Sequence, residues 1–183
     1  SMRSRKVEGI KKLARLLVKV EKPSEIEALL ARMEAIPQLY KGNKGYAFEL
    51  LSPEGDLVLI HAEDDIKDLK KVEEEVTFAK DEKLRYLTAF EISVEINLPD
   101  ETSSLLEKEE IENRLAFNQA QGSDLLVENN ITWDLSMLKF QVENLDLPVL
   151  RQRFEEAGYF IPKSEKFFLT KDTNNIELWF EAV

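Results

Sequence analysis

The chain carries the same hairpin pattern twice. Tyr46–His61 reads YAFELLSPEGDLVLIH, and Lys166–Phe180 reads KFFLTKDTNNIELWF. In each stretch two apolar runs flank a short polar turn, which is typical of a β-hairpin. Each hairpin follows a strand pattern and a helix pattern, so it closes a unit of strand, helix and hairpin. This repeat constrains the fold strongly, because small sheets of this kind must pair to cover their edges.

The first unit can be followed residue by residue. Leu13–Val20 is rich in β-formers and predicts a strand. Ser24 and Glu27 have the spacing of a capping box, which predicts a helix that starts there. An apolar helical stripe follows, at Ile26, Leu29, Leu30 and Met33. With the hairpin at Tyr46–His61, the predicted order is β, α and then two or three strands.

A charged stretch separates this unit from the next. Ala62–Lys83 has no glycine, and the spacing of its apolar residues predicts a thin amphipathic helix. Phe90–Leu98 alternates as a strand, with its apolar residues on one face. A helix over Glu101–Asn113 and further strands follow, and these strands are predicted at Leu115–Gln121, Leu125–Glu128 and Ile131–Trp133.

The last unit starts with a strand at Met137–Val142. Asp146 and Pro148 are typical of a helix start, and Gly158 suits the end of that helix. Three βαβββ-like units can thus be counted, and the predicted class is α+β. We expect an N-terminal half-domain (1–66), a charged helical linker (67–86) and a domain of two paired modules (87–183). One helix covers one face of each small sheet, which leaves the other face to line a cleft.

Composition excludes several kinds of site. The net charge of −11 disfavours nucleic acids and anionic membranes as partners. The absence of cysteine excludes disulfides, thiol nucleophiles and zinc–thiolate sites. His61 is the only histidine, so no site can use two imidazoles. No apolar run is as long as a membrane span, and no signal peptide is visible.

Several short stretches carry a family resemblance. They are KGYAFE at Lys44–Glu49, SPEGD at Ser52–Asp56, HAEDDI at His61–Ile66, ITWD at Ile131–Asp134 and IELWF at Ile176–Phe180. Repeated βαβββ units resemble the vicinal-oxygen-chelate, or glyoxalase/bleomycin-resistance, superfamily. These stretches resemble, more specifically, the streptococcal CppA family, whose members are named as complement-C3-degrading proteinases. The likeness runs over essentially the whole chain.

The resemblance implies a function and partners. It implies a C3-degrading proteinase on a glyoxalase-like scaffold, with complement C3 as the partner. It also implies one further module before Ser1, which would cover the sheet of residues 13–61; a homodimer through the N-terminal module is the alternative. The sequence itself favours a cytoplasmic location, whereas a role on C3 requires an extracellular or cell-surface one.

The superfamily's metal positions fall mostly on residues that cannot bind a metal. By resemblance, Glu91 lies near a first-strand ligand position and Glu177 at a last-strand position. Met137 and either Val58 or Leu59 occupy the others. Two carboxylates would hold Mg²⁺ or Mn²⁺ only weakly. No cofactor is therefore expected, with Glu91 and Glu177 as the weak metal candidates and with solvated strand carboxylates as the alternative.

The residues do not form a known protease set. A serine protease needs a base beside its nucleophile, and no GxSxG motif is present. Asp172–Asn174 resembles the Asp-Thr-Gly of aspartic proteases, but Asn174 replaces the glycine and there is no second copy. We expect His61 to be a surface histidine with acidic neighbours. Catalytic residues therefore stay unknown.

The remaining alternative is a cleft that binds a small ligand or a peptide. Aromatic residues on predicted strands would line it, with Tyr46 and Phe48 in the first unit. The candidate ligand-binding residues are Glu91, Trp133, Phe140, Glu177 and Trp179. The alternative is that these aromatics are core. Three functions thus stay open: a C3-degrading proteinase by resemblance, a non-proteolytic cleft protein, and a degenerate metal-dependent glyoxalase- or dioxygenase-like enzyme. Because Glu177 has no carboxylate counterpart in the first hairpin, a polar site is expected in the C-terminal pair.

Overall fold

The computed structural model describes residues 3–108, 114–156 and 166–183. These residues form two compact units. From here on, the first unit is the one that comprises residues 13–96 and 113–116, and the second unit is the one that comprises residues 1–12, 97–112 and 117–183. Among the described residues, no helix has the length and apolar character that crossing a membrane requires. The domain boundaries drawn from the sequence stay a prediction.

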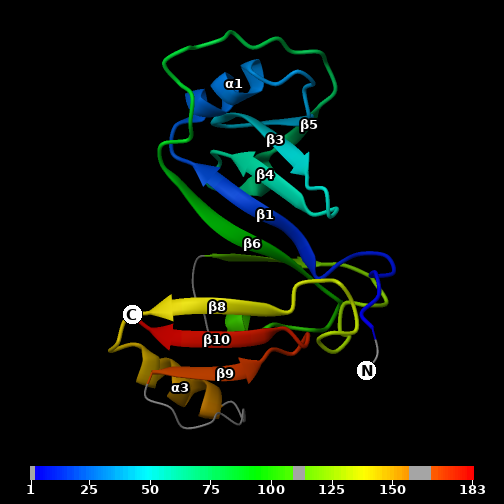
Figure 1. The fold of residues 1–183 in the computed structure, drawn as a ribbon, viewed down its shortest axis with the longest axis vertical. Coiled ribbons are helices and arrows are strands. Elements are labelled where there is room, and N and C mark those ends of the chain that lie inside the picture. The colour runs from blue at the N-terminus through cyan, green and yellow to red at the C-terminus, as the bar shows by residue number, and fades with distance from the viewer. Residues whose placement is uncertain (1–2, 109–113, 157–165) are drawn as a thin grey trace. The chain divides into compact units, whose positions relative to one another are not determined.

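The first unit begins with the predicted order of strand, helix and three strands (Figure 1). Its elements are β1 (Leu13–Val20), α1 (Pro23–Ala31), β2 (Gln38–Gly42), β3 (Gly45–Leu51), β4 (Leu57–His61), the 3₁₀ turn η1 (Ile66–Asp68), β5 (Lys70–Val72) and most of β6 (Phe90–Leu98). With β7 (Leu115–Gln119), the strands form a seven-stranded sheet in the order β5-β2-β3-β4-β1-β6-β7. The mixture of parallel and antiparallel pairs with few helices confirms the predicted α+β class, and it is consistent with a glyoxalase-like arrangement.

Helix α1 covers one face of this sheet. Ile26 and Leu30 of α1 pack against Val20, Leu39 and Phe48 of the strands, and all five are buried. Side chains alternate along a strand, so the neighbouring residues of β1 and β4 face the other way. That second face carries Leu17 and Leu59 together with charged residues. The prediction that one helix covers one face is therefore confirmed for this unit. The other face carries no helix and is called the open face here, although Ile66, Leu69 and Ala116 pack on part of it.

The second unit contains a three-stranded sheet in the order β8-β10-β9. Its elements are α2 (Leu105–Lys108), β8 (Met137–Val142), α3 (Leu147–Glu156), β9 (Phe167–Lys171) and β10 (Glu177–Ala182). Phe154 of α3 packs on Phe168 and Phe180, with ring centroids 5.6 and 5.4 Å away. All three rings are buried. A helix thus covers one face of this sheet too.

The two hairpins have the same topology and the same turn. In each repeat the first strand pairs in parallel with the last strand, β1 with β4 and β8 with β10. The turn hydrogen bonds also match. Ser52 N–H donates to Asp56 O as Asp172 N–H donates to Ile176 O, and Gly55 and Asn175 both have positive φ. Gly55 of the first turn therefore corresponds to Asn175 of the second. The helix end predicted at Gly158 lies outside the described residues.

The predicted linker helix is wrong. Ala62–Lys83 contains η1 and β5 and then runs without regular structure to β6. Its apolar residues do not share one face. Ile66 and Leu69 pack against Leu17 and its neighbours on the open face, whereas Val72 and Val76 pack on the helix-covered side. The segment passes around the edge of the sheet, so apolar residues that have helical spacing in the sequence lie on opposite faces of the sheet.

The start of α1 also differs from the prediction. The helix begins at Pro23 after Lys22, and no side chain caps it. The capping box at Ser24 and Glu27 is therefore wrong. The acid that makes specific contacts in this part of the helix lies between these two residues. Glu25 is buried and accepts hydrogen bonds from the backbone N–H and the hydroxyl of Thr88.

The region between β6 and β8 is less regular than predicted. Helix α2 begins at Leu105, because Asp172 of the second hairpin accepts the Leu105 N–H at 2.8 Å. Residues 125–126 and 131 lie in turns, 127–128 have no regular structure, and Thr132 forms only an isolated bridge with Arg5. Asp124 fixes this region by accepting two hydrogen bonds from the Arg5 guanidinium, each 2.7 Å long. The two predicted strands there are therefore wrong.

The matching turns lead to a stability prediction. Gly55 has a φ of +88°, and a Cβ added there would have no atom within 4 Å. Gly55→Ala should therefore destabilise the fold by about 1 kcal/mol through backbone conformation alone. Gly55→Asn should cost less, because asparagine tolerates this conformation and occupies it at Asn175. Urea unfolding measures both, with the neighbouring Glu54→Ala as the control; equal losses for alanine and asparagine would contradict the explanation.

Candidate functional site

Three polar side chains form one row across the open face of the first unit. β1 pairs with β4 so that Lys19 lies opposite His61, and it pairs with β6 so that Lys19 lies opposite Glu91. Residues in register on adjacent strands point to the same face. His61, Lys19 and Glu91 therefore lie side by side on β4, β1 and β6. The next row on this face contains Leu59, Leu17 and Ser93.

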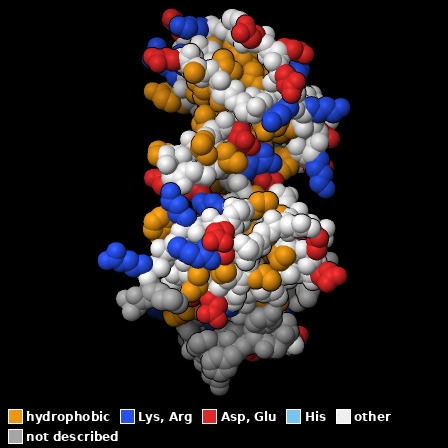
Figure 2. All heavy atoms as spheres, turned by 90° about the vertical axis from the view of Figure 1, so that its right-hand side faces the viewer, with side chains coloured by type: hydrophobic (Ala, Val, Ile, Leu, Met, Phe, Trp, Pro, Cys, Tyr) orange, Lys and Arg blue, Asp and Glu red, His pale blue; other side chains and the backbone are white. Residues whose placement is uncertain are grey.

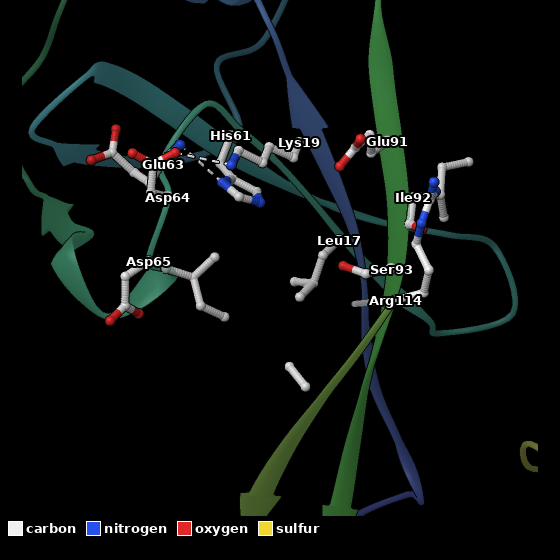
Figure 3. A pocket seen from close by; sticks show the side chains of 12 residues that line it. Leu17, Lys19, His61, Glu63, Asp64, Asp65, Glu91, Ile92, Ser93 and Arg114 are labelled. Carbon is white, nitrogen blue, oxygen red and sulfur yellow. Dashed lines mark hydrogen bonds and ion pairs between the residues drawn. The ribbon is translucent and has the colours of Figure 1, made fainter. Parts of the chain in front are cut away.

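All residues of these two rows except Leu59 line a cavity of about 540 Å³. In Figure 3, His61 and Lys19 lie on one side, Glu91 and Ser93 on the other, and Leu17 between them. The Glu91 carboxylate and the Ser93 hydroxyl point toward the space between the two sides. The other lining residues are Glu63, Asp64, Asp65, Ile66, Ile92, Arg114 and Ala116. All of them belong to the first unit.

His61 is held in one orientation and in its neutral form. Its side chain is 4% exposed, so the expectation of a surface histidine is wrong. The backbone N–H of Glu63 donates to His61 Nδ1 at 3.1 Å. In the neutral ring the proton must then be on Nε2, which faces the cavity in Figure 3. Burial, with the positive charges of Lys19 and Arg15, lowers the pKa of His61 to about 4.

Lys19 is the cation at the centre of the row. Its ammonium lies 3.0 Å from Asp64, and Lys44 lies 3.2 Å from the same carboxylate oxygen. These two lysines lower the pKa of Asp64. Both lysines and Asp64 are well exposed, so the contacts are weak and exchange readily. Lys19 can therefore leave Asp64 for a ligand in the cavity at low cost.

Most acids around the cavity already have partners. The buried Glu63 carboxylate accepts the Lys44 N–H at 2.8 Å. It lies so close to Gly42 that a Cβ there would be 2.5 Å from it. Asp65 accepts the Lys67 N–H at the start of η1. Glu91, by contrast, makes no ion pair and no side-chain hydrogen bond with any described residue. It is the carboxylate in the wall that is available to a ligand.

The same face continues into a second charged group. Arg15 donates to Glu95 at 2.8 and 3.2 Å and to Glu49 at 3.1 Å. Burial and the charge of Glu49 raise the pKa of Tyr40 beside it. Acidic and basic side chains are interspersed on the surface in Figure 2 as well, without a large area of one sign. The face is thus polar but largely self-neutralised outside the cavity.

The five candidate ligand-binding residues are not brought together within one unit. Glu91 lines the cavity of the first unit, and the other four lie in the second unit. Phe140 stacks on Phe180 at 4.8 Å, on the helix-covered face. Trp179 lies on the opposite face, where it stacks on Phe167 at 5.1 Å with the Lys139 ammonium over its ring. The role of these residues in binding stays a prediction.

Three further positions differ from what the sequence suggested. Trp133 lies in a bend rather than on a strand, and it is 60% exposed. Phe48 is fully buried under α1 and does not line a cleft. Glu177 starts β10, and the matching turns make it the equivalent of Leu57 in the first hairpin rather than of Val58 or Leu59. By the same correspondence, His61 matches Glu181.

The superfamily's metal does not fit the residues described. Among them, no group of three or more His, Asp or Glu side chains is arranged to hold a metal ion. Glu91 lies beside Lys19 in the row, and an ammonium at that position repels a cation. Glu91 is therefore poorly suited to hold a divalent metal.

The environment of His61 leads to a pH prediction. The folded pKa of about 4 lies below the ordinary value of 6.5, so between these values the unfolded chain binds a proton that the folded chain does not. Stability is thus greatest above the unfolded pKa and falls as the pH drops. We expect His61 to contribute a loss of about 2 kcal/mol between about pH 7 and pH 5. Urea unfolding at both pH values should show this loss, and His61→Gln should remove it. A titration of the single imidazole by NMR with a midpoint near its ordinary value would contradict it.

Comparison with known proteins identifies the family. A family model described as CppA N-terminal matches residues 1–72, and one described as CppA C-terminal matches residues 87–180. No curated protein matches the chain. The crystal structure of cppA protein from Streptococcus pneumoniae TIGR4 is 60% identical, with a TM-score of 0.80 over 100% of this chain and 76% of that chain. The chain therefore belongs to the CppA family.

Proposed function

We propose that this member of the CppA family is a binding protein that takes a small polar ligand in the cavity of its first unit and does not cleave peptide bonds. The observation that carries the proposal is the row of His61, Lys19 and Glu91 on the open face of the sheet. It combines a hydrogen-bond donor, a cation and an unpaired carboxylate around one cavity. A volume of about 540 Å³ is in the range of small-molecule sites.

The arrangement around His61 argues against a serine-protease mechanism. Ser93 is the hydroxyl in the cavity wall, but β1 lies between its strand and that of His61. Strands are about 4.8 Å apart, so the two backbones are separated by about 10 Å. Direct proton transfer needs about 3 Å between the heavy atoms. The hydrogen bond at Nδ1 also prevents the ring from turning toward the serine.

The protonation behaviour of His61 points the same way. An efficient general base has a pKa near the working pH. Burial and the nearby cations lower the pKa of His61 to about 4, so it holds a proton poorly at neutral pH. A neutral Nε2–H that stays in place is suited to donate a hydrogen bond. The C3-degrading activity implied by the resemblance therefore finds no support in the first unit's cavity.

The first test is direct incubation with complement C3. We expect purified protein to leave C3 intact, as judged by gel electrophoresis and intact mass. A trypsin digest shows that the C3 used can be cut. His61→Gln and Ser93→Ala serve as matched variants, and all three proteins should behave alike. Cleavage by the unmodified protein that is lost in His61→Gln, with the fold retained, would overturn the proposal.

The second test is ligand binding itself. The imidazole signals of His61 need no assignment, because the chain has one histidine. A panel of amino acids, dipeptides, small carboxylic acids and sugars can be titrated against the Hε1 signal. We expect at least one compound to shift the signal in a saturable way and to do so more weakly in Glu91→Gln. If no member of the panel shifts it, the cavity does not bind a small polar ligand.

A further inference from the structure

We infer that the ligand of this cavity is a dipeptide-sized zwitterion, with its carboxylate against Lys19 and His61 and its ammonium against Glu91. This inference rests on the proposed binding function and adds the chemical class of the ligand. Three features carry it: the donors at one end of the row, the unpaired acid at the other, and the distance between them.

One end of the row is suited to a carboxylate. His61 Nδ1 accepts the hydrogen bond from the Glu63 N–H, so the ring proton is on Nε2, which faces the cavity and has no partner among the described residues. Lys19 lies on the adjacent strand and can add a charge-assisted hydrogen bond. Together they offer two donors but only one positive charge. This matches a monoanion better than a phosphate.

The charge of the whole wall also excludes a dianion as the preferred ligand. The lining residues include two cations, Lys19 and Arg114, and four acids, Glu63, Asp64, Asp65 and Glu91. Arg114 donates to the carbonyl of Ile92 at 3.3 Å and lies beside Ile92 in Figure 3. A ligand with two negative charges would be repelled by the acidic excess. A ligand that carries its own cation would not.

Glu91 supplies the site for that cation. Its side chain is exposed on the wall and makes no ion pair or side-chain hydrogen bond with any described residue. In Figure 3 its carboxylate points toward the cavity rather than away from it. A primary ammonium suits an unpaired carboxylate on this wall, since the two can form a charge-assisted hydrogen bond.

The spacing of the row sets the length of the ligand. Lys19 is one strand from Glu91 and His61 is two strands away, so their backbones are about 5 and 10 Å from that of Glu91. Two extended residues span about 7 Å. The charged ends of a dipeptide therefore fall within this interval, whereas those of a single amino acid are too close together. Between them, Ser93 can bond the peptide group, and Leu17, Ile66 and Ala116 provide apolar contact for a side chain.

The experiment compares end-blocked ligands with charge-removing variants. The probes are alanyl-alanine, its N-acetyl form, its C-terminal amide and free alanine, each titrated against the His61 Hε1 signal. We expect alanyl-alanine to bind about tenfold more tightly than either blocked form, which is the effect of one charge-assisted contact. Free alanine should also bind more weakly than the dipeptide.

The variants assign each end of the ligand. Glu91→Gln should weaken alanyl-alanine about tenfold and leave the N-acetyl form unchanged, because that form has no ammonium. Lys19→Met should weaken alanyl-alanine and leave the amide unchanged. Lys44→Met is the matched control, since Lys44 also pairs with Asp64 but does not line the cavity. Glu54→Gln, on the exposed turn after β3, is the control for the loss of an acid.

The outcomes separate this inference from the proposed function. If another compound of the panel shifts His61 but alanyl-alanine does not, the cavity binds a ligand and the zwitterion is wrong. If both blocked forms bind as well as the free dipeptide, the charged ends are not recognised and the inference fails. If no compound shifts His61, the proposed function fails with it.

Discussion

The parallel pairing of the first and last strands of a repeat determines the rest of this structure. In the first unit it places β1 between β4 and β6, so residues from three distant parts of the chain lie in one row. A parallel pair requires a crossover, and α1 provides it on one face. The other face is then left without a helix. This connection and the antiparallel pairing of β6 with β1 together determine the position of the cavity and the residues of its wall.

Local patterns predicted the elements that depend on local physics. The strand at Leu13–Val20, the helix stripe around Ile26 and Leu30 and both hairpins are confirmed. Their signals are alternation, helical spacing and turn residues, which act within a few positions. The prediction of a helix at Ala62–Lys83 is wrong because it, too, used only a local signal. Ile66 and Val72 belong to a helix-like pattern of apolar residues, but they pack on opposite faces of the sheet. Only the tertiary fold decides on which face each residue packs.

The candidate site was harder to predict because it depends on register. Glu91 was singled out from the sequence, but its neighbours Lys19 and His61 were not connected with it. A strand's register with a distant partner cannot be read from either strand alone. His61 looked like a surface residue because acids follow it in the chain. In the structure those acids turn outward or bind backbone N–H groups, and only the Glu63 N–H reaches the imidazole.

The outer edge of the first unit's sheet has a consequence for association between chains. β5 is only three residues long, and two of them are Lys70 and Lys71. Short, lysine-bearing edge strands resist the addition of a strand from another molecule. β5 is the terminal strand of the sheet, so its outer backbone groups have no strand partner among the described residues, but this border is short and positively charged. The edge therefore disfavours uncontrolled sheet growth between chains.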